Sequence, residues 1–201
     1  MTIDPATTPA RDFYRHLIAS ITPRPIAWVS TVSPSGVPNL APFSFFNGVG
    51  ANPPAVVFCP TNKRDGGRKD TLVNVEATRQ FVVNVVSDRL AGRMNATSAE
   101  FEYGVDEFGR CGLTPIASVR VRPPGVGESA VRMECDLIDV VRVGDGPLSG
   151  NAVIGRIVLL HADESVLDAA GQVDPAKLDT VGRMGGSLYA RTRDRFAMER
   201  P

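Results

Sequence analysis

Two apolar runs separated by a turn dominate the first quarter of the chain. Residues 23–32 are rich in β-branched and aromatic side chains, and residues 37–44 follow the Pro/Ser/Gly segment at 33–36. This pattern predicts a β-hairpin with a short loop. The second run contains Pro38 and Pro42, and proline has no amide hydrogen to give to a central ladder. We therefore expect the second strand at an edge or rim, where a flat ligand can approach the backbone.

Further apolar or alternating runs predict strands at residues 55–59, 80–86, 117–122, 130–143 and 152–162. The helical spacing of apolar residues predicts a short N-terminal helix over about 9–21, with Thr8 as its N-cap. Two shorter helices are expected, one capped by Asp70 or Thr71 and one capped by Asp88 that runs from Arg89 to about Ala96. Several strands joined by short turns, with few helices, favour an antiparallel barrel or sandwich over a βαβ fold. Periodicity leaves the barrel and the sandwich both open.

Two of these runs carry more detailed expectations. In the run 130–143 one face holds Val131, Met133, Cys135 and Leu137, and the other holds Arg132, Glu134 and Asp136. We expect the first face to meet the core and the second to meet water. Gly155 interrupts the apolar run 152–162, which is typical of a bulge or of a close approach by another group.

Length and composition limit the classes of protein. A chain of 201 residues suits one domain with one core. Lys plus Arg and Asp plus Glu each number 22, so no overall field favours nucleic acid or an anionic membrane. The three cysteines have neither CxxC nor zinc-site spacing, which argues against a disulfide scaffold and a metal site. Without a signal-peptide pattern or an apolar run long enough to span a bilayer, we expect a cytoplasmic protein.

Two stretches could carry chemistry, and each has a purely structural alternative. Lys69-Asp70-Thr71 combines a cation, a hydroxyl and the free amides of a helix start, which suits a phosphate; the alternative is a solvated loop with an ordinary cap. Residues 39–44 offer small and rigid side chains to a flat ligand; the alternative is an edge strand whose prolines prevent aggregation. The Gly-x-Gly-x-x-Ala at 125–130 opens a strand-like run rather than a helix, so we reject dinucleotide binding there.

Four blocks in order resemble the flavin reductase-like, FMN-binding split-barrel family. The first block consists of R-P-I-A-x-V-S-T at 24–31, a glycine at 36 and N-x-A-P-F-S-x at 39–45. The second is K-D-T-x-x-N at 69–74. The third is a strand ending in H-x-D at 155–163, and the fourth is R-x-G-G-x-x-Y at 183–189. The resemblance extends from about Phe13 to Tyr189. Ordered agreement over most of the chain is more specific than any one block.

The resemblance implies a mainly β fold with peripheral helices, a Greek-key split β-barrel that forms a homodimer with FMN near the subunit interface. It implies one domain over residues 1–201, with a C-terminal extension over about 163–201. Cofactor contacts are implied for Thr31, Asn39, Ala41, Pro42, Phe43, Ser44, Asn47, Lys69, Asp70, Thr71, Arg183, Gly185 and Tyr189. Residues 69–71 then lie near the ribityl phosphate, and backbone amides of residues 39–44 face the pyrimidine edge of the ring.

The activity implied by the resemblance is that of a flavin reductase, in which NAD(P)H gives a hydride to the flavin. His161 is implied as the residue beside the nicotinamide; a structural role for this lone histidine is the alternative. Reduced FMN would pass to a partner monooxygenase. Two other functions stay open: a flavoredoxin-like electron carrier that holds FMN tightly, and a barrel that binds another small ligand. Arg183 likewise has an alternative role as an unpaired surface arginine.

Overall fold

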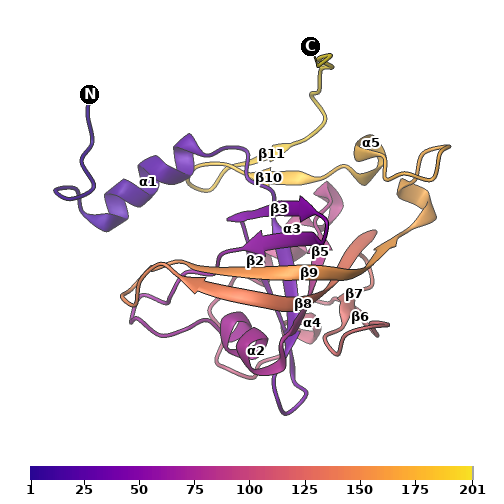
Figure 1. Cartoon of the computed structure of the whole chain (residues 1–201), viewed down its shortest axis with the longest axis horizontal. Coiled ribbons are helices and arrows are strands. Elements are labelled where there is room, and N and C mark those ends of the chain that lie inside the picture. The colour runs from indigo at the N-terminus through magenta and orange to yellow at the C-terminus, as the bar shows by residue number, and fades with distance from the viewer. Residues whose placement is uncertain (201) are drawn as a thin grey trace.

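The computed structural model describes residues 1–200 and is built around a seven-stranded antiparallel sheet (Figure 1). The strand order is β2-β1-β5-β8-β9-β4-β3. These strands are β1 (Ala27–Val32), β2 (Pro38–Phe43), β3 (Phe46–Ala51), β4 (Pro54–Phe58), β5 (Gln80–Val85), β8 (Val131–Arg142) and β9 (Asn151–Ala162). Two small hairpins pair β6 (Pro115–Ile116) with β7 (Gly125–Val126), and β10 (Val181–Arg183) with β11 (Tyr189–Arg191).

The connection between β2 and β3 shows that the sheet is curled into a barrel. These two strands form opposite edges of the sheet, yet only Ser44 and Phe45 separate them in the chain. In a flat sheet the edges would lie about 29 Å apart, at ~4.8 Å per strand spacing. Three peptide steps reach at most about 11 Å. The sheet therefore curls until its edges approach each other, which confirms the predicted split barrel.

Short helices surround the barrel without covering it. They are α1 (Ala10–Ser20), α2 (Asp70–Thr78), α3 (Ala91–Ala96), α4 (Glu107–Arg110) and α5 (Pro175–Leu178), with 3-10 turns at Asp88–Leu90 and Glu164–Val166. In Figure 1 α1 projects away from the barrel and α2 lies against the sheet. Over residues 1–200 no helix combines the length and the apolar character that crossing a membrane requires.

The predicted caps of the first two helices were wrong by one or two residues. The N-cap of α1 is Pro9 rather than Thr8, and the N-cap of α2 is Lys69 rather than Asp70 or Thr71. Neither cap residue hydrogen-bonds the helix through its side chain. The second case leaves the first amides of α2 without a side-chain acceptor, which matters for the cleft described below.

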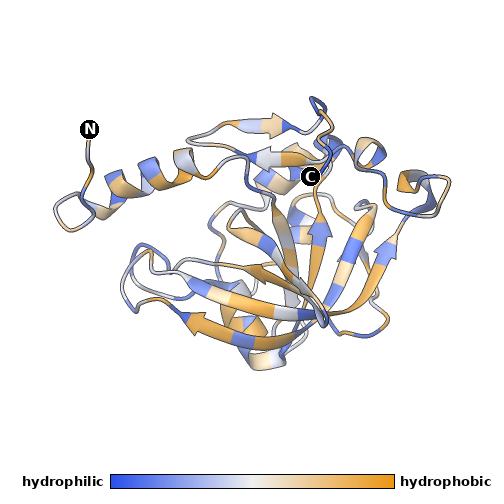
Figure 2. Cartoon of the chain, turned by 45° about the horizontal axis from the view of Figure 1, so that its top comes forward, coloured by the Kyte–Doolittle hydropathy of each residue, from blue (hydrophilic) through white to orange (hydrophobic). Residues whose placement is uncertain are grey.

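Strand β1 is buried along its whole length and separates two apolar clusters. Ala27 and Val29 face the barrel interior with Phe58 and Phe81. Trp28 faces the opposite side, where it is fully buried and its Nε1 donates to Thr97 Oγ1 at 2.9 Å. Trp28 is therefore a core residue. Figure 2 shows the hydrophobic residues concentrated on the barrel strands.

The predicted strand at 117–122 is wrong, because this segment is a loop wrapped around a buried carboxylate. The side chain of Glu134 is 1% exposed. It accepts hydrogen bonds from the amides of Val119, Arg120 and Val121 at 2.8, 2.6 and 3.2 Å. His161 Nε2 lies 2.6 Å from Glu134 Oε1, the oxygen that also accepts from the Val119 amide. These bonds satisfy the loop amides in place of a neighbouring strand.

Glu134 also departs from the predicted alternation of β8. Val131, Cys135 and Leu137 are buried as expected, but Glu134 is buried too. The register between β8 and β9 shifts between Glu134 and Cys135. Such an irregularity interrupts the alternation of side chains across a sheet. A two-residue period alone therefore misassigned the carboxylate to the solvent.

Gly155 in β9 provides a test of the barrel packing. A Cβ at this position would lie 2.6 Å from Cε1 of Phe81 and closer still to Cζ, and Phe81 is fully buried. We predict that Gly155→Ala lowers the free energy of unfolding by about 1–3 kcal/mol, because the buried ring has to shift. Gly150→Ala is the control, since its Cβ would meet nothing within 4 Å. Equal denaturant midpoints for the two variants would contradict this packing.

The hydrogen bonds that Glu134 accepts from the 119–121 amides, together with its contact to His161, should make a pH-dependent contribution to the free energy of unfolding. Burial alone raises the pKa of Glu134, but the amides of Val119 and Arg120 together with His161 hold the pKa below its ordinary 4.5. A lowered folded-state pKa stabilises the fold above about 4.5, and this stabilisation is lost as the pH falls through the folded value. Glu134→Gln should therefore cost about 2–3 kcal/mol at pH 7, and the difference from wild type should shrink towards pH 3.

Urea denaturation of both proteins across this pH range measures the difference. Glu102→Gln, on an exposed loop, is the control and should leave the unfolding free energy nearly unchanged. A Glu134→Gln variant as stable as wild type at pH 7 would contradict the assigned role of the carboxylate. So would a difference that stays constant down to pH 3.

Candidate functional site

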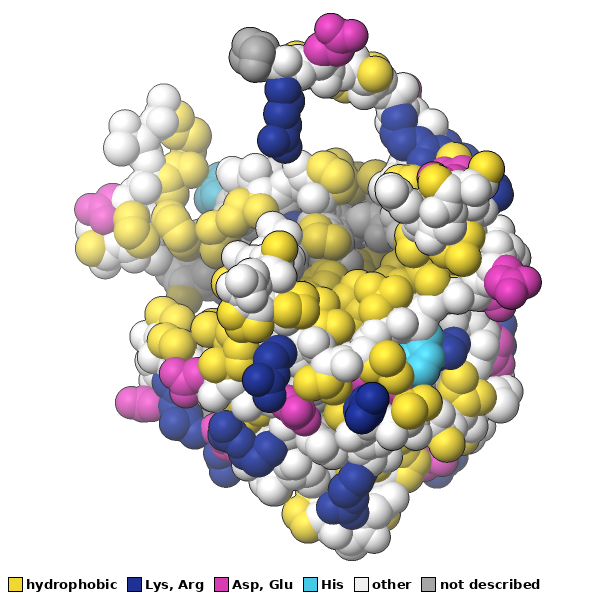
Figure 3. Space-filling view, turned by 45° about the vertical axis from the view of Figure 1, so that its right-hand side comes forward, with side chains coloured by type: hydrophobic (Ala, Val, Ile, Leu, Met, Phe, Trp, Pro, Cys, Tyr) yellow, Lys and Arg dark blue, Asp and Glu magenta, His cyan; other side chains and the backbone are white. Residues whose placement is uncertain are grey.

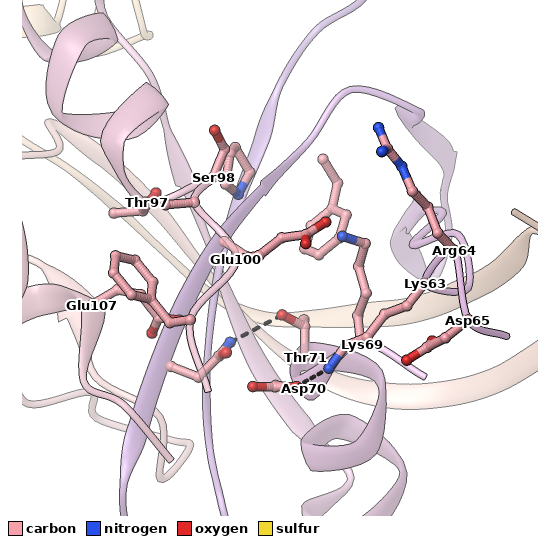
Figure 4. A pocket seen from close by; sticks show the side chains of 16 residues that line it. Lys63, Arg64, Asp65, Lys69, Asp70, Thr71, Thr97, Ser98, Glu100 and Glu107 are labelled. Carbon is pink, nitrogen blue, oxygen red and sulfur yellow. Dashed lines mark hydrogen bonds and ion pairs between the residues drawn. The ribbon is translucent and has the colours of Figure 1, made fainter. Parts of the chain in front are cut away.

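A cleft of about 390 Å³ lies beside β2. Its other walls are the loop and helix start around residues 63–71, and the segment 97–101 together with Glu107 (Figure 4). The full lining is Asn39, Ala41, Pro42, Phe43, Lys63, Arg64, Asp65, Lys69, Asp70, Thr71, Thr97, Ser98, Ala99, Glu100, Phe101 and Glu107. The structure therefore brings together seven of the residues singled out from the sequence, from Asn39 to Thr71.

The start of α2 gives one wall of the cleft a positive character. The first amides of a helix have no partner within the helix, and here no side chain caps them. Lys63 Nζ lies 3.1 Å from Asp70 Oδ1 and neutralises that carboxylate. Arg64 and Lys69 form no ion pair with any residue between 1 and 200. Free cations beside a helix start form a suitable site for an anionic group.

Acidic side chains on the opposite wall limit where an anion can bind. Glu100 and Glu107 both line the cleft, and Figure 4 shows the side chains of Glu100 and Lys69 extending towards its middle. Burial raises the pKa of the Glu107 carboxyl, although the Leu40 amide opposes this effect. The charge distribution therefore favours an anion at the α2 end of the cleft and disfavours one at the Glu107 end.

A buried network of amides and hydroxyls supports the cleft from below. Asn39 Nδ2 donates to Thr31 Oγ1 at 3.2 Å and to Thr71 Oγ1 at 3.0 Å. Asn74 Nδ2 donates to the same Thr31 hydroxyl at 3.1 Å, and the Tyr103 hydroxyl donates to Asn74 Oδ1. Thr31 is fully buried and does not line the cleft, so its contribution is to position Asn39.

The backbone of β2 differs from the expectation that its amides face a ligand. The Leu40 amide donates to Glu107 Oε2 at 2.9 Å. The pairing with β1 turns the amides of Asn39, Ala41 and Phe43 away from the cleft, and Pro42 has no amide hydrogen. That expectation is therefore wrong for residues 39–43. It failed because local sequence did not reveal which side of the strand faces β1.

Several residues singled out from the sequence lie outside this cleft. Ser44 Oγ accepts from Arg24 Nε at 3.3 Å, and the buried Arg24 also donates to the carbonyls of Ile18, Ile21 and Met184. Asn47 lies on the exposed strand β3, where its Oδ1 accepts from the following amide. His161 lies at the end of β9 beside Glu134. None of these three side chains lines the cleft.

The C-terminal motif forms a separate cluster next to an apolar groove. The Arg183 guanidinium lies 4.5 Å from the centre of the Tyr189 ring, and Gly185 packs closely against Ala19 of α1. A groove of about 220 Å³ runs beside β10 between residues 23–26, 85–86 and 180–182. Figure 3 shows a hollow with hydrophobic walls near the C-terminal segment. In a single chain Arg183, Gly185 and Tyr189 are thus not part of the β2 cleft.

Sequence reasoning missed the wall formed by residues 97–101 and Glu107. This stretch has no regular apolar period, and it includes the four-residue helix α4, which is too short to give a helical pattern. Its only local signal was Asp106, whose side chain caps α4 by accepting from the Phe108 amide. The partner of Glu107 is 67 residues away in the chain, so no local pattern could identify it.

Comparison with known proteins gives a consistent result. The chain is 39% identical over 178 residues to an uncharacterized protein of Aquifex aeolicus, covering 89% of each. It is 36% identical to the uncharacterized protein YwrF of Bacillus subtilis, covering 96% of this chain and 95% of YwrF. Among solved structures, nitrilotriacetate monooxygenase component B from Bacillus cereus is 34% identical, with a TM-score of 0.93 and 98% coverage of both chains.

Two further findings identify the family. The 2-nitrobenzoate 2-nitroreductase NbaA of Pseudomonas fluorescens is 30% identical, with a TM-score of 0.90, covering 100% of this chain and 96% of NbaA. The flavoredoxin of Desulfovibrio vulgaris (Miyazaki F) is 21% identical, with a TM-score of 0.76, and shares the fold over 98% of this chain and 97% of its own. The sequence model of the flavin reductase like domain matches residues 19–185. The chain therefore belongs to the flavin reductase like domain family.

Proposed function

We propose that the cleft beside β2 binds FMN and that the protein is a flavin reductase that uses NAD(P)H. The observation that carries the proposal is the arrangement of the cleft. Two cations with no ion-pair partner among residues 1–200 lie near a helix start, next to a strand with small and rigid residues. The first feature suits a phosphate and the second suits a flat ring. Membership of the flavin reductase like family supports the same ligand.

The residues present fit a phosphorylated flavin. A volume of about 390 Å³ falls within the range of about 300–1,000 Å³ that is usual for ligand pockets. Because Lys63 neutralises Asp70, Lys69 and Arg64 remain available for the phosphate charge. The Thr71 hydroxyl accepts from Asn39, so its own hydrogen remains available for a ribityl or phosphate oxygen.

A bound flavin would supply the redox chemistry by accepting a hydride from the nicotinamide. The residues of the chain bind and orient the two flat molecules, which is the main contribution that a protein makes to such a transfer. In the proposal Lys69 and the first amides of α2 hold the phosphate, while Ala41 and Pro42 leave room for the ring. For His161, contact with the nicotinamide is supported by the family resemblance alone.

We propose that a second copy of the chain completes the site in a homodimer. Ser44, Asn47, Arg183, Gly185 and Tyr189 lie outside the cleft of their own chain, which is compatible with contacts across a subunit interface. Helix α1 and its C-cap also expose apolar side chains, with Tyr14 42% and the C-cap residue Ile21 50% exposed. Exposed apolar side chains on one projecting helix are typical of an interaction surface.

The similarity to a monooxygenase component B supports a partner monooxygenase that receives the reduced flavin. We place the protein in the cytoplasm, because Cys59, Cys111 and Cys135 are free thiols, as is usual in reducing compartments. Burial raises the pKa of Cys135 well above its ordinary value, so this thiol is protonated at neutral pH and chemically inert.

Anaerobic mixing of the protein with FMN and either NADH or NADPH tests the activity. We predict that FMN binds and that its visible absorbance bleaches rapidly after addition of the nicotinamide cofactor. Bound FMN that stays yellow with both cofactors would contradict a reductase and would favour an electron carrier of the flavoredoxin type. A protein that binds no FMN would contradict both functions.

The phosphate position can be tested separately. Lys69→Met should weaken FMN about tenfold, because a charge-assisted contact to the phosphate is lost, and should leave riboflavin binding nearly unchanged. Lys177→Met is the matched control, since this lysine lies in α5 and bonds the Leu167 carbonyl. Flavin fluorescence titrations measure both ligands. An equal loss of affinity for FMN and riboflavin would place the phosphate elsewhere.

A further inference from the structure

The charges that line the β2 cleft do not balance once its internal ion pair is set aside. Lys63 Nζ and Asp70 Oδ1 lie 3.1 Å apart and neutralise each other. The other charged lining residues are two cations and three carboxylates: Arg64, Lys69, Asp65, Glu100 and Glu107. None of these five side chains forms an ion pair with any residue between 1 and 200. The cleft therefore carries an excess of negative charge, although the start of α2 is positive.

Glu100 differs from the other two carboxylates because no group of its own chain occupies it. Glu107 Oε2 and Asp65 Oδ1 each accept a backbone amide, at 2.9 and 2.8 Å. Glu100 is exposed, and its side chain accepts no hydrogen bond from residues 1–200. In Figure 4 the side chains of Glu100 and Lys69 both extend towards the middle of the cleft. A free carboxylate and a free ammonium thus share the space that a ligand would enter.

Lys69 cannot interact equally with Glu100 and with a phosphate. A phosphate monoester carries about −1.5 to −2 charges at pH 7. The two positive charges of Arg64 and Lys69 offset that phosphate and leave Glu100 uncompensated. A carboxylate attracts an ammonium by the same kind of charge-assisted contact that a phosphate makes. Glu100 therefore competes with the phosphate for Lys69 and repels the phosphate while it is bound.

We propose that Glu100 keeps FMN exchangeable, so that the cleft takes FMN as a diffusible substrate and does not hold it permanently. The inference rests on the proposed FMN site, which by itself would suit either tight or loose binding. A reductase that supplies reduced flavin to a partner has to release it. Because Glu100 is exposed, water and salt screen its charge, so the effect is several-fold and not many orders of magnitude.

Fluorescence titrations of FMN and riboflavin against the wild-type protein and Glu100→Gln test this inference. The wild-type protein should bind FMN with a Kd of about 1 µM or weaker and lose it on desalting. Glu100→Gln should bind FMN about three- to tenfold more tightly at low salt, because the competing and repelling charge is gone. Riboflavin lacks the phosphate, so its affinity should stay nearly unchanged. The gain for FMN should shrink at about 0.5 M salt.

Two further variants make the test specific. Glu102→Gln is the matched control, because Glu102 is exposed two residues further along the same segment and does not line the cleft. It should leave both affinities nearly unchanged. In a Lys69→Met background, Glu100→Gln should gain less affinity for FMN, because the ammonium for which the two anions compete is absent. The full gain in that background would overturn the competition for Lys69.

The outcomes separate this inference from the function on which it rests. An FMN affinity of Glu100→Gln no higher than that of the wild-type protein would overturn the inference and leave the FMN site standing. Wild-type protein that retains one FMN per chain through desalting would do the same. Failure of the wild-type protein to bind either flavin would instead overturn the proposed function.

Discussion

The pairing register between β1 and β2 determines the geometry of the candidate site. Strand β1 is buried between β2 and β5, so its backbone requires donors at alternate positions of β2. Pro38 and Pro42 provide none, and they can only occupy positions that face outward. A shift by one residue would turn both prolines towards β1 and move every side chain of β2 to the other face. The same register directs Leu40 into the Trp28 cluster and Asn39 towards α2.

Two buried carboxylates connect this barrel to the segments around it. Glu134 on β8 binds three consecutive amides of the loop after β6, and Glu107 on α4 binds the Leu40 amide. Each carboxylate satisfies backbone groups that have no strand partner. In both cases a side chain that would ordinarily be solvated holds an irregular segment against the sheet. The loops of this fold are therefore positioned by specific hydrogen bonds as well as by apolar packing.

The features that sequence predicted correctly depend on local patterns. The hairpin with its proline edge, the strands around residues 55–59 and 80–86, and the close approach at Gly155 all follow from periodicity or from backbone chemistry. The errors at 117–122 and at Glu134 have a non-local cause, since a distant carboxylate there replaces a neighbouring strand. Half of the cleft was predicted, because residues 39–43 and 69–71 meet there, whereas the wall at 97–101 gave no periodic signal.

A crystal structure of the protein grown with FMN tests the central claim most directly. The account predicts the phosphate beside Lys69 and the start of α2, and the ring beside Ala41 and Pro42 of β2. FMN bound instead in the apolar groove between residues 23–26 and 180–182, with the β2 cleft empty, would contradict it.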